Sequence, residues 1–169
     1  MTLLILSDSH GRVNNINDAV ALNKNAEAVL FLGDGLRDLT RAETLGKPII
    51  SVRGNCDLSA SDVNGVYTLS FGEYNIMLTH GHLFSVKSTL DTLAAHAASM
   101  GADVALFGHT HIPIDRYLPA GCEVGGVTLK KPLRLFNPGS IGEPRGSRAS
   151  FGVITIRGRD ILTSHGELA

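Results

Sequence analysis

Carboxylates, an asparagine and histidines, which are residue types that bind metal ions or transfer protons, gather in five short clusters of this chain. The clusters are Asp8-Ser9-His10, Gly33-Asp34, Gly54-Asn55-Cys56-Asp57, His80-Gly81-His82 and Gly108-His109-Thr110-His111. Taken singly, Asp-Ser and Gly-Asp pairs are also typical of turns and helix starts, and a lone histidine is more often a structural residue than a ligand. The last cluster is the strongest signal, because two histidines separated by one residue can point their imidazoles at a common site.

Each cluster follows a run of apolar residues that predicts a β-strand. The expected strands are Leu3–Leu6, Val29–Leu32, Pro48–Val52, Tyr74–Thr79 and Val104–Phe107. The first three runs are continuously apolar, which is typical of strands covered on both faces of a sheet. Beyond the ends of these strands come, in chain order, Asp8, Asp34, Asn55, His80 and His109. Because ligands bind beyond the carboxyl ends of the strands in an α/β sheet, we expect these side chains to converge.

Apolar periodicity predicts the remaining elements. One helix is expected over about residues 14–24, with Asn14 or Asn15 as its cap, and another over Val86–Met100, with Gly101 as a C-cap. Val66–Phe71 is expected to form a hairpin with the strand that follows it. Short strands are expected near residues 114–118, 122–129, 133–136, 151–157 and 160–164. No repeat or linker divides the chain, so we predict one α/β domain over residues 1–169.

The composition excludes several classes of protein. Hydrophobic residues make up 43% of the 169 residues and charged residues only 18%, which argues for a folded core and against disorder. The apolar runs are too short to cross a bilayer and no secretion signal is found, so we expect a cytoplasmic protein with no membrane partner. The net charge of −1 lacks the basic excess of a general nucleic-acid binder and suits a small phosphate-containing substrate. Two cysteines, Cys56 and Cys122, are too few for a disulfide framework.

Together the clusters supply what a binuclear metal centre requires. Two divalent cations about 3.5–4 Å apart need a bridging carboxylate, a role that suits Asp34. Mixed oxygen and nitrogen donors favour Mn, Fe, Zn, Co or Ni over Ca or Mg. The other ligands would divide into two sets, Asp8 and His10 with one histidine of the final pair, and Asn55 and His80 with the other. Because only two carboxylates face two dications, the surplus positive charge would attract phosphate and lower the pKa of a bridging water, giving a hydroxide nucleophile.

The order of these motifs resembles the calcineurin-like metallophosphoesterase superfamily, and within it the small single-domain phosphodiesterases of bacteria and archaea. The similarity covers almost the whole chain, from Leu4 through Asn137-Pro138-Gly139-Ser140 to the closing strands. It implies a four-layer α/β/β/α sandwich, in which two mixed β-sheets lie face to face with helices outside and the metal ions at one edge. For the ligands it implies that His111 lies beside Asp8 and His10, and His109 beside Asn55 and His80.

The expected cofactors are two divalent transition-metal ions, Mn²⁺ first, with Ni²⁺, Co²⁺, Fe²⁺ or Zn²⁺ as alternatives. The leading expectation for function is hydrolysis of a small phosphodiester by in-line attack of the bridging hydroxide. One alternative is a phosphomonoesterase or a nucleotide phosphohydrolase of the same superfamily. Another is a non-catalytic scaffold similar to the retromer subunit of eukaryotic cells, although every ligand position here holds a competent residue. The resemblance also makes a homodimer a reasonable expectation.

One residue departs from much of the superfamily. The residue after the motif asparagine is often a histidine that protonates the leaving alkoxide or orients the phosphate, and here it is Cys56. A thiol has a pKa of about 8.5 and donates hydrogen bonds weakly, so it would be a poor acid; a small residue packed beside the site is the plainer interpretation. The small phosphodiesterase branch resembles this chain in having cysteine here, which predicts a preference for diesters with good leaving groups. His82 is the alternative proton donor.

Other polar residues have weaker signals. Asp57 is expected either to accept a hydrogen bond behind a ligand or to serve as a turn residue. Arg12 could contact a substrate phosphate or face solvent at a helix start. The Asn137-Pro138-Gly139-Ser140 turn is expected to shape the site. His96 and His165 are expected at the surface.

Overall fold

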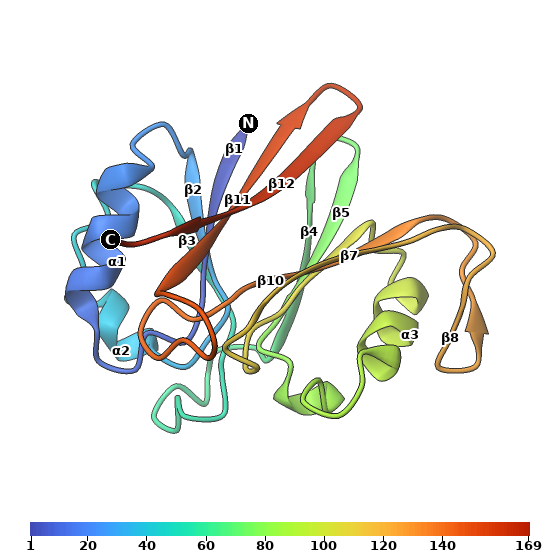
Figure 1. Ribbon diagram of the computed structural model, residues 1–169, viewed down its shortest axis with the longest axis horizontal. Coiled ribbons are helices and arrows are strands. Elements are labelled where there is room, and N and C mark those ends of the chain that lie inside the picture. The colour runs from blue at the N-terminus through green and yellow to red at the C-terminus, as the bar shows by residue number, and fades with distance from the viewer.

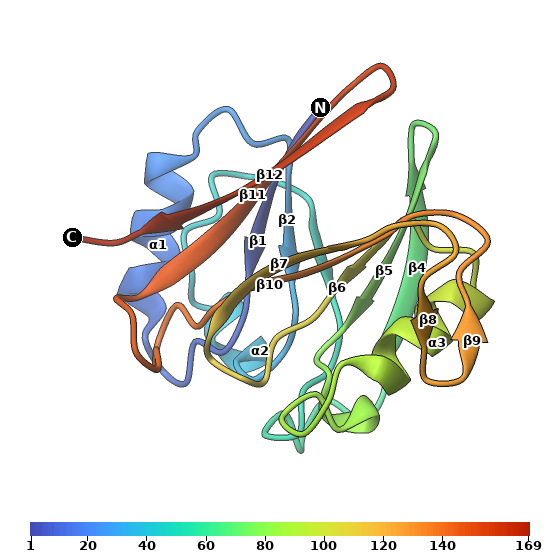
Figure 2. The same cartoon turned by 45° about the vertical axis from the view of Figure 1, so that its right-hand side comes forward.

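The computed structural model describes all residues, 1–169, and contains two five-stranded β-sheets and one small hairpin. The first sheet has the strand order β12 (Asp160–Glu167), β11 (Ser150–Arg157), β1 (Thr2–Leu6), β2 (Ala28–Phe31) and β3 (Ile49–Ser51). The second sheet has the order β4 (Val66–Phe71), β5 (Tyr74–Thr79), β6 (Val104–Leu106), β10 (Leu133–Pro138) and β7 (Pro113–Leu118). The two sheets face each other, as Figures 1 and 2 show.

Both sheets are mixed, and their parallel strands bring the chemically active residues to one edge. In the first sheet β1, β2 and β3 run parallel, and in the second β5, β6 and β10 do. Leu6 of β1 pairs with Phe31 of β2, and Phe31 pairs with Ser51 of β3, so these strands end level with one another. In Figure 1 β1 begins at the N-terminus near the top, and its carboxyl end lies near α2 at the bottom.

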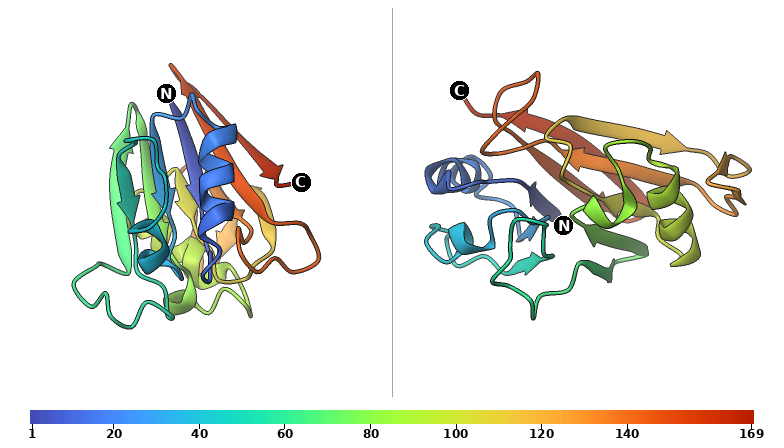
Figure 3. Two further views of the ribbon diagram at one scale, coloured as in Figure 1. Left: turned by 90° about the vertical axis from the view of Figure 1, so that its left-hand side faces the viewer. Right: turned by 90° about the horizontal axis from the view of Figure 1, so that it is seen from below.

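Helices cover the outer face of each sheet. Two of them, α1 (Val13–Leu22) and α2 (Leu36–Leu39), lie outside the first sheet, and α3 (Asp91–Ser99) lies outside the second with the hairpin β8 (Glu123–Val124) and β9 (Val127–Thr128) (Figures 2 and 3). A short 3₁₀ helix, η1 (His82–Phe84), precedes α3. The expected α/β/β/α sandwich is therefore confirmed. No helix is both long and apolar enough to cross a bilayer.

Alternate residues of the strands build separate layers of core. Leu3 and Ile5 of β1 pack between the sheets against residues such as Ile76 and Phe136, whereas Leu4 and Leu6 face α1. Successive side chains of a strand point to opposite faces, so a strand with helices on one side and a sheet on the other must be apolar throughout. This requirement explains the unbroken apolar run of β1, which ends where the site begins.

The structure corrects the expected cap of the first helix, the burial of the third strand and the extent of the strand near residues 122–129. The N-cap of α1 is Arg12, without a side-chain hydrogen bond, and Asn15 instead donates to the carbonyl of Ile141. The edge strand β3 is only partly covered because it pairs with β2 alone. The region expected as one strand over 122–129 is two short strands, since Gly125 and Gly126 have positive φ and turn the chain between them.

The second predicted helix is shorter than expected. It begins at Asp91 rather than Val86, because Ser85 has a positive φ of 52° and the chain from His82 to Leu90 forms η1 and turns. Val86 is nevertheless buried in the core, which accounts for the apolar periodicity. The expected role of Gly101 holds in part, since it follows the helix with a φ of 68°.

Candidate metal centre

The backbone at the candidate ligands is unusual. Only seven residues other than glycine have positive φ, and five of them are candidate ligands: Asp8, His10, Asp34, His109 and His111. Aspartate and histidine tolerate this conformation better than most residues, but it is sparsely populated and is retained where the surroundings enforce it. The sharp turns re-aim side chains directly after β1, β2 and β6. The edge of the two sheets is therefore built to point these groups inward.

One group of side chains comes from the loops after β1 and β6. The ligand atoms of Asp8, His10 and His111 lie within 4.8 Å of one another. Asp8 Oδ1 is 3.1 Å from His111 Nε2 and 3.7 Å from His10 Nε2. The two histidine Nε2 atoms are 3.3 Å apart. This is the grouping of His111 that the family resemblance implied.

A second group joins Asp34, His80 and His109, again within 4.8 Å of one another. His80 Nε2 is 3.3 Å from Asp34 Oδ2 and 3.1 Å from His109 Nδ1. Asp34 Oδ2 also lies 3.9 Å from His10 Nε2, so this carboxylate stands between the two groups. Asp34 therefore has the position that a bridging ligand needs.

The donor atoms are arranged to bind metal ions rather than to form hydrogen bonds with one another. His80 and His111 each place Nδ1 against a backbone carbonyl, of Leu32 and Glu143 respectively. A carbonyl only accepts, so Nδ1 carries the proton and Nε2 of a neutral ring presents a lone pair to the site. Asp8 Oδ1 is buried without a hydrogen-bond partner. Facing lone pairs and an orphaned buried carboxylate oxygen are costly without a cation between them.

The charges of these groups are strongly coupled. Burial acts to raise the pKa of Asp8, but its contacts with His10, His111 and His80 outweigh this and hold the pKa well below the usual range. Burial opposes the shift at Asp34 too, and the neighbouring His80 lowers its pKa to about 2. The neighbouring Asp8 carboxylate raises the pKa of His10. At neutral pH both carboxylates are thus ionised, as metal ligands must be.

The other two histidines of this region behave differently. Burial and the nearby charge of His80 lower the pKa of His109 to about 4. The same two causes lower the pKa of His82, which is half-buried on η1 with its ring 5.5 Å from that of His80. Both rings are therefore neutral at pH 7. His82 Nδ1 is buried and has no hydrogen-bond partner.

Asn55 and Cys56 lie at the open side of the site. Both are exposed on the loop after β3, and the Asn55 amide lies 3.3 Å from Cys56 Sγ. The backbone N–H of Cys56 donates to Asp34 Oδ1 at 2.7 Å, which ties this loop to the central carboxylate. Although Cys56 is exposed, partial desolvation of its sulfur and the neighbouring Asp34 raise the pKa of the thiol to about 11.

Asp57 anchors the loops behind the site. Its carboxylate accepts hydrogen bonds from four backbone N–H groups, those of Asp34, Gly35, Leu36 and Gly54, at 2.7–2.9 Å. It is buried and belongs to none of the groups of clustered ligand atoms. Of the two expectations for Asp57, the supporting role agrees with this geometry. A carboxylate held by so many donors fixes the loops after β2 and β3 relative to each other.

Asp38 plays a similar part that sequence reasoning missed. This buried residue of α2 accepts hydrogen bonds from the Ser9 hydroxyl and, at 2.8 Å, from the backbone N–H of Gly11. Gly35 must be glycine here, because a Cβ would lie 1.8 Å from Ser9 Oγ. The only signal in the sequence was an acidic residue four positions after Asp34, which resembles an ordinary first-turn aspartate.

The Asn137-Pro138-Gly139-Ser140 segment ends β10 and shapes the site, as expected. Asn137 donates to the carbonyl of Gly108 and to Thr110 Oγ1 between the two histidines of the last cluster. Ser140 Oγ donates to the carbonyl of Asp8 at 2.7 Å. The segment thereby joins the loops after β1 and β6, which belong to different sheets.

The two histidines expected at the surface make more contacts than predicted. His165 is exposed, but its ring stacks 4.5 Å from that of Phe136 and it hydrogen-bonds the carbonyl of Asn137, so it links the two sheets. The surface expectation is wrong for His96, which is half-buried beside Phe84 with ring centroids 4.9 Å apart.

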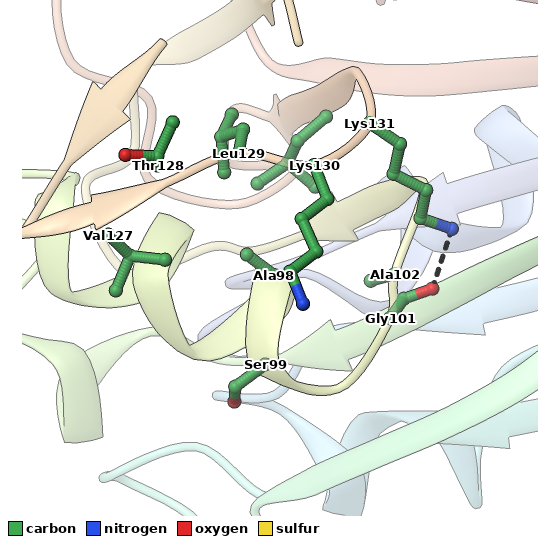
Figure 4. Close-up of a pocket in the computed structure, with 10 residues that line it drawn as sticks. Ala98, Ser99, Gly101, Ala102, Val127, Thr128, Leu129, Lys130 and Lys131 are labelled. Atoms are coloured by element: carbon green, nitrogen blue, oxygen red, sulfur yellow. Dashed lines mark hydrogen bonds between the residues drawn. The ribbon is translucent and has the colours of Figure 1, made fainter. Parts of the chain in front are cut away.

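The largest cavity of the molecule lies elsewhere. It has a volume of about 480 Å³ and is formed by the end of α3 and the segment from Val127 to Leu133 (Figure 4). Its walls are mainly apolar, and Lys131 at its rim bonds the Gly101 carbonyl. None of the clustered ligands lines it. Shallower hollows of about 330 Å³ and 170 Å³ lie at the candidate metal centre, beside Asn55 and His82 and beside His10 and Cys56.

Residues 1–159 match the family model of the calcineurin-like phosphoesterase superfamily domain, and the chain belongs to this family. It is 38% identical to the probable metallophosphoesterase YsnB of Bacillus subtilis over 157 residues, 92% of this chain and 85% of that protein. The phosphodiesterase YfcE of Escherichia coli is 28% identical over 179 aligned positions, 91% of this chain and 87% of that protein. The fold also resembles Vps29 of Entamoeba histolytica, in a D62A mutant structure, with a TM-score of 0.72, 21% identity and full coverage of both chains.

Proposed function

We propose that this protein is a phosphodiesterase that uses two divalent metal ions held by Asp8, His10, Asp34, Asn55, His80, His109 and His111. The observation that carries the proposal is the pair of donor groups, Asp8, His10 and His111 and Asp34, His80 and His109, with Asp34 between them. YfcE, a relative over most of both chains, is named as a phosphodiesterase, which supports the choice of diester.

The chain's own residues set the charge of the centre. Two carboxylates, Asp8 and Asp34, face up to four charges of bound metal, so the loaded site stays positive and attracts a phosphate. When bound, the metals supply Lewis acidity, which activates a water for in-line attack and neutralises charge that develops on the phosphoryl oxygens. Mixed imidazole and carboxylate donors suit Mn²⁺, the metal we propose first.

The site lacks an efficient proton donor for the leaving group. The Cys56 thiol, with its pKa raised to about 11, is too weak an acid to donate a proton efficiently at neutral pH. His82 has a lowered pKa and is mostly neutral, so it does not supply an imidazolium proton either. We therefore propose that the enzyme prefers diesters whose leaving group departs without protonation, such as aryl phosphodiesters. Replacing Cys56 by His would raise turnover of alkyl diesters more than of aryl diesters.

Metal reconstitution tests the proposal. The protein would be stripped with a chelator, reloaded separately with Mn²⁺, Ni²⁺, Co²⁺, Zn²⁺ and Mg²⁺, and assayed with an aryl phosphodiester and the matching monoester. We expect Mn²⁺ to restore diester turnover and Asp34→Asn to abolish it. Asp18→Asn, at an exposed position of α1, is the matched control and should retain activity. Bound metal, counted by elemental analysis, should be about two ions per chain in the control.

The same assay separates the alternatives. Turnover of the monoester alone would point to a phosphomonoesterase or nucleotide phosphohydrolase. A fully loaded protein without turnover of either ester would favour a scaffold role, a possibility that the shared fold with Vps29 keeps open. A homodimer, the other expectation, would be tested by light scattering of the same metal-loaded sample.

A further inference from the structure

We propose that arginines on both sides of the metal centre form a groove for a phosphodiester that carries at least one additional phosphate group. The inference deepens the proposed function, on which it rests, by naming a class of substrate. The groove consists of three hollows on the site edge, defined below by the residues that they share. Its arginines are Arg12, Arg37, Arg41 and Arg53.

The three hollows adjoin one another. The central hollow contains His10, Asp34 and Cys56 of the candidate centre together with Arg37. It shares Gly11 with a hollow of about 320 Å³ that is lined by Arg12 and Arg41. On the other side it shares Asp57 with the hollow that contains Arg53, Asn55 and His82. The three hollows therefore adjoin at shared wall residues beside the metal ligands.

The four arginines come from separate segments of the chain. Arg12 follows β1, Arg37 and Arg41 belong to α2 and the turn after it, and Arg53 follows β3. The ion pairs of the structure engage only two arginines, Arg134 and Arg159, both elsewhere. None of the groove arginines thus has a carboxylate within 4.0 Å. Folding has brought unpaired guanidinium groups together at one edge, although the net charge of the whole chain is −1.

The carboxylates that line the groove, Asp34, Asp38 and Asp57, form no ion pair with these arginines. Asp57 is held by four backbone N–H groups, and Asp38 by Ser9 and Gly11. Both are buried, whereas Arg12, Arg37 and Arg41 are exposed and Arg53 is half-buried. The cationic heads are therefore available to a ligand.

A second phosphate is the ligand group that fits this arrangement. The metal centre would hold the scissile phosphate, and a guanidinium binds a neighbouring phosphate through two parallel hydrogen bonds. The hollow at Arg12 and Arg41 has only one hydrophobic lining residue, Val13, so it suits a charged group better than a ring or an acyl chain. A short, doubly charged phosphodiester would use the centre and this hollow together.

Binding of dinucleotides tests the groove apart from catalysis. Calorimetry on the Mn²⁺-loaded protein would compare a non-hydrolysable phosphonate analogue of dithymidine monophosphate with the same analogue bearing a 5′- or a 3′-terminal phosphate. We expect at least one phosphorylated form to bind about ten-fold more tightly, as charge-assisted hydrogen bonds to a partly exposed phosphate allow. The advantage should vanish in Arg12→Gln/Arg41→Gln. It should persist in Arg116→Gln/Arg157→Gln, which changes two exposed arginines outside the groove.

The outcomes distinguish this proposal from the phosphodiesterase proposal. The groove proposal would be refuted if all three dinucleotides bind equally tightly, or if the tighter binding of a phosphorylated form survives in Arg12→Gln/Arg41→Gln. Either result would count against it even if aryl diesters are hydrolysed. Absence of aryl diester turnover in the metal-loaded wild-type protein would instead refute the enzymatic proposal. Circular dichroism and the metal content of the double variant exclude a folding or metal-loading defect as the cause of weaker binding.

Discussion

The carboxylate of Asp38 on α2 accepts a hydrogen bond from the hydroxyl of Ser9, a residue that lies between two candidate metal ligands. Asp38 also binds the N–H of Gly11, so it holds the chain on both sides of His10. His10 itself has a φ of 43°, a conformation that an unsupported loop rarely keeps. The two hydrogen bonds to Asp38 fix the direction in which the His10 imidazole points.

Asp38→Ala should therefore weaken metal binding without removing a ligand. We expect roughly ten-fold lower affinity for one of the two metals, the typical effect of losing a group that orients a ligand. The metal-free protein should lose about 2 kcal/mol of unfolding free energy, because two donors become unsatisfied. Calorimetric metal titration and urea unfolding measure the two effects, with Asp18→Ala as the control. Unchanged metal affinity in a destabilised protein would show that Asp38 serves the fold only.

Asp57→Asn tests the anchor behind Asp34. The substitution keeps the shape of the side chain, but an amide NH₂ cannot accept hydrogen bonds from the N–H groups that now point at both carboxylate oxygens. We expect diester turnover to fall by about ten- to a hundred-fold, because displaced ligands reduce metal affinity. Recovery of most activity at high Mn²⁺ concentration would support this explanation. Wild-type metal affinity in the variant would contradict it.

Gly54→Ala should disturb the bridging carboxylate directly. A Cβ at Gly54 would lie 2.1 Å from Asp34 Oδ1 and 2.5 Å from the backbone nitrogen of Asp34. Asp34 stands between the two donor groups. Its displacement should therefore reduce the metal content of the purified protein to less than one ion per chain. Gly65→Ala is a suitable control, because its Cβ would meet only the end of the flexible Leu83 side chain. Full metal occupancy in Gly54→Ala would argue against Asp34 as the bridge.

The pH dependence of stability should change sign when metal binds. Carboxylates raise the pKa of His10 and His80, so in the metal-free protein these rings stabilise the fold below their unfolded pKa of about 6.5 and cease to do so as pH rises through the raised values. His109, with its pKa lowered to about 4, instead favours folding as pH rises from about 4 to 6.5. The Tm of the metal-free protein should thus be highest near about pH 6.5.

On the acid side, the lowered pKa of Asp34 gives stability that is lost as pH falls from about 4 through about 2. In the Mn²⁺-loaded protein the Tm should rise between about pH 6 and pH 8, because protons compete with metal for the histidines. Thermal melts with Mn²⁺ and with chelator measure both trends. A metal-free Tm that also climbs over this range would show that His10 and His80 are neutral without metal.

Much of the site could be predicted from local sequence. Apolar runs that stop at Asp8, Asp34, Asn55, His80 and His109 specify strands whose parallel ends meet, so the convergence of these residues follows from sheet geometry. The sequence also indicates Asp57 and the Asn137 turn as candidates near the site. By contrast, the start of the second helix lies at Asp91 and not at Val86, because Ser85, in an apolar periodic stretch, adopts a left-handed conformation that periodicity does not reveal.

What the chain determines by itself is therefore which residues stand at the strand ends, since hydrophobic patterning is a local property of the sequence. Only the tertiary structure decides the orientation of these side chains and the hydrogen bonds that hold their loops in place. Asp38 binds Ser9 across 29 positions, Ser140 binds Asp8 across 132, and Arg12 meets Arg41 in one hollow. Such contacts depend on the packing of α2 and of two sheets against each other. No periodicity records them, because a hydrogen bond between distant loops leaves no spacing in the sequence.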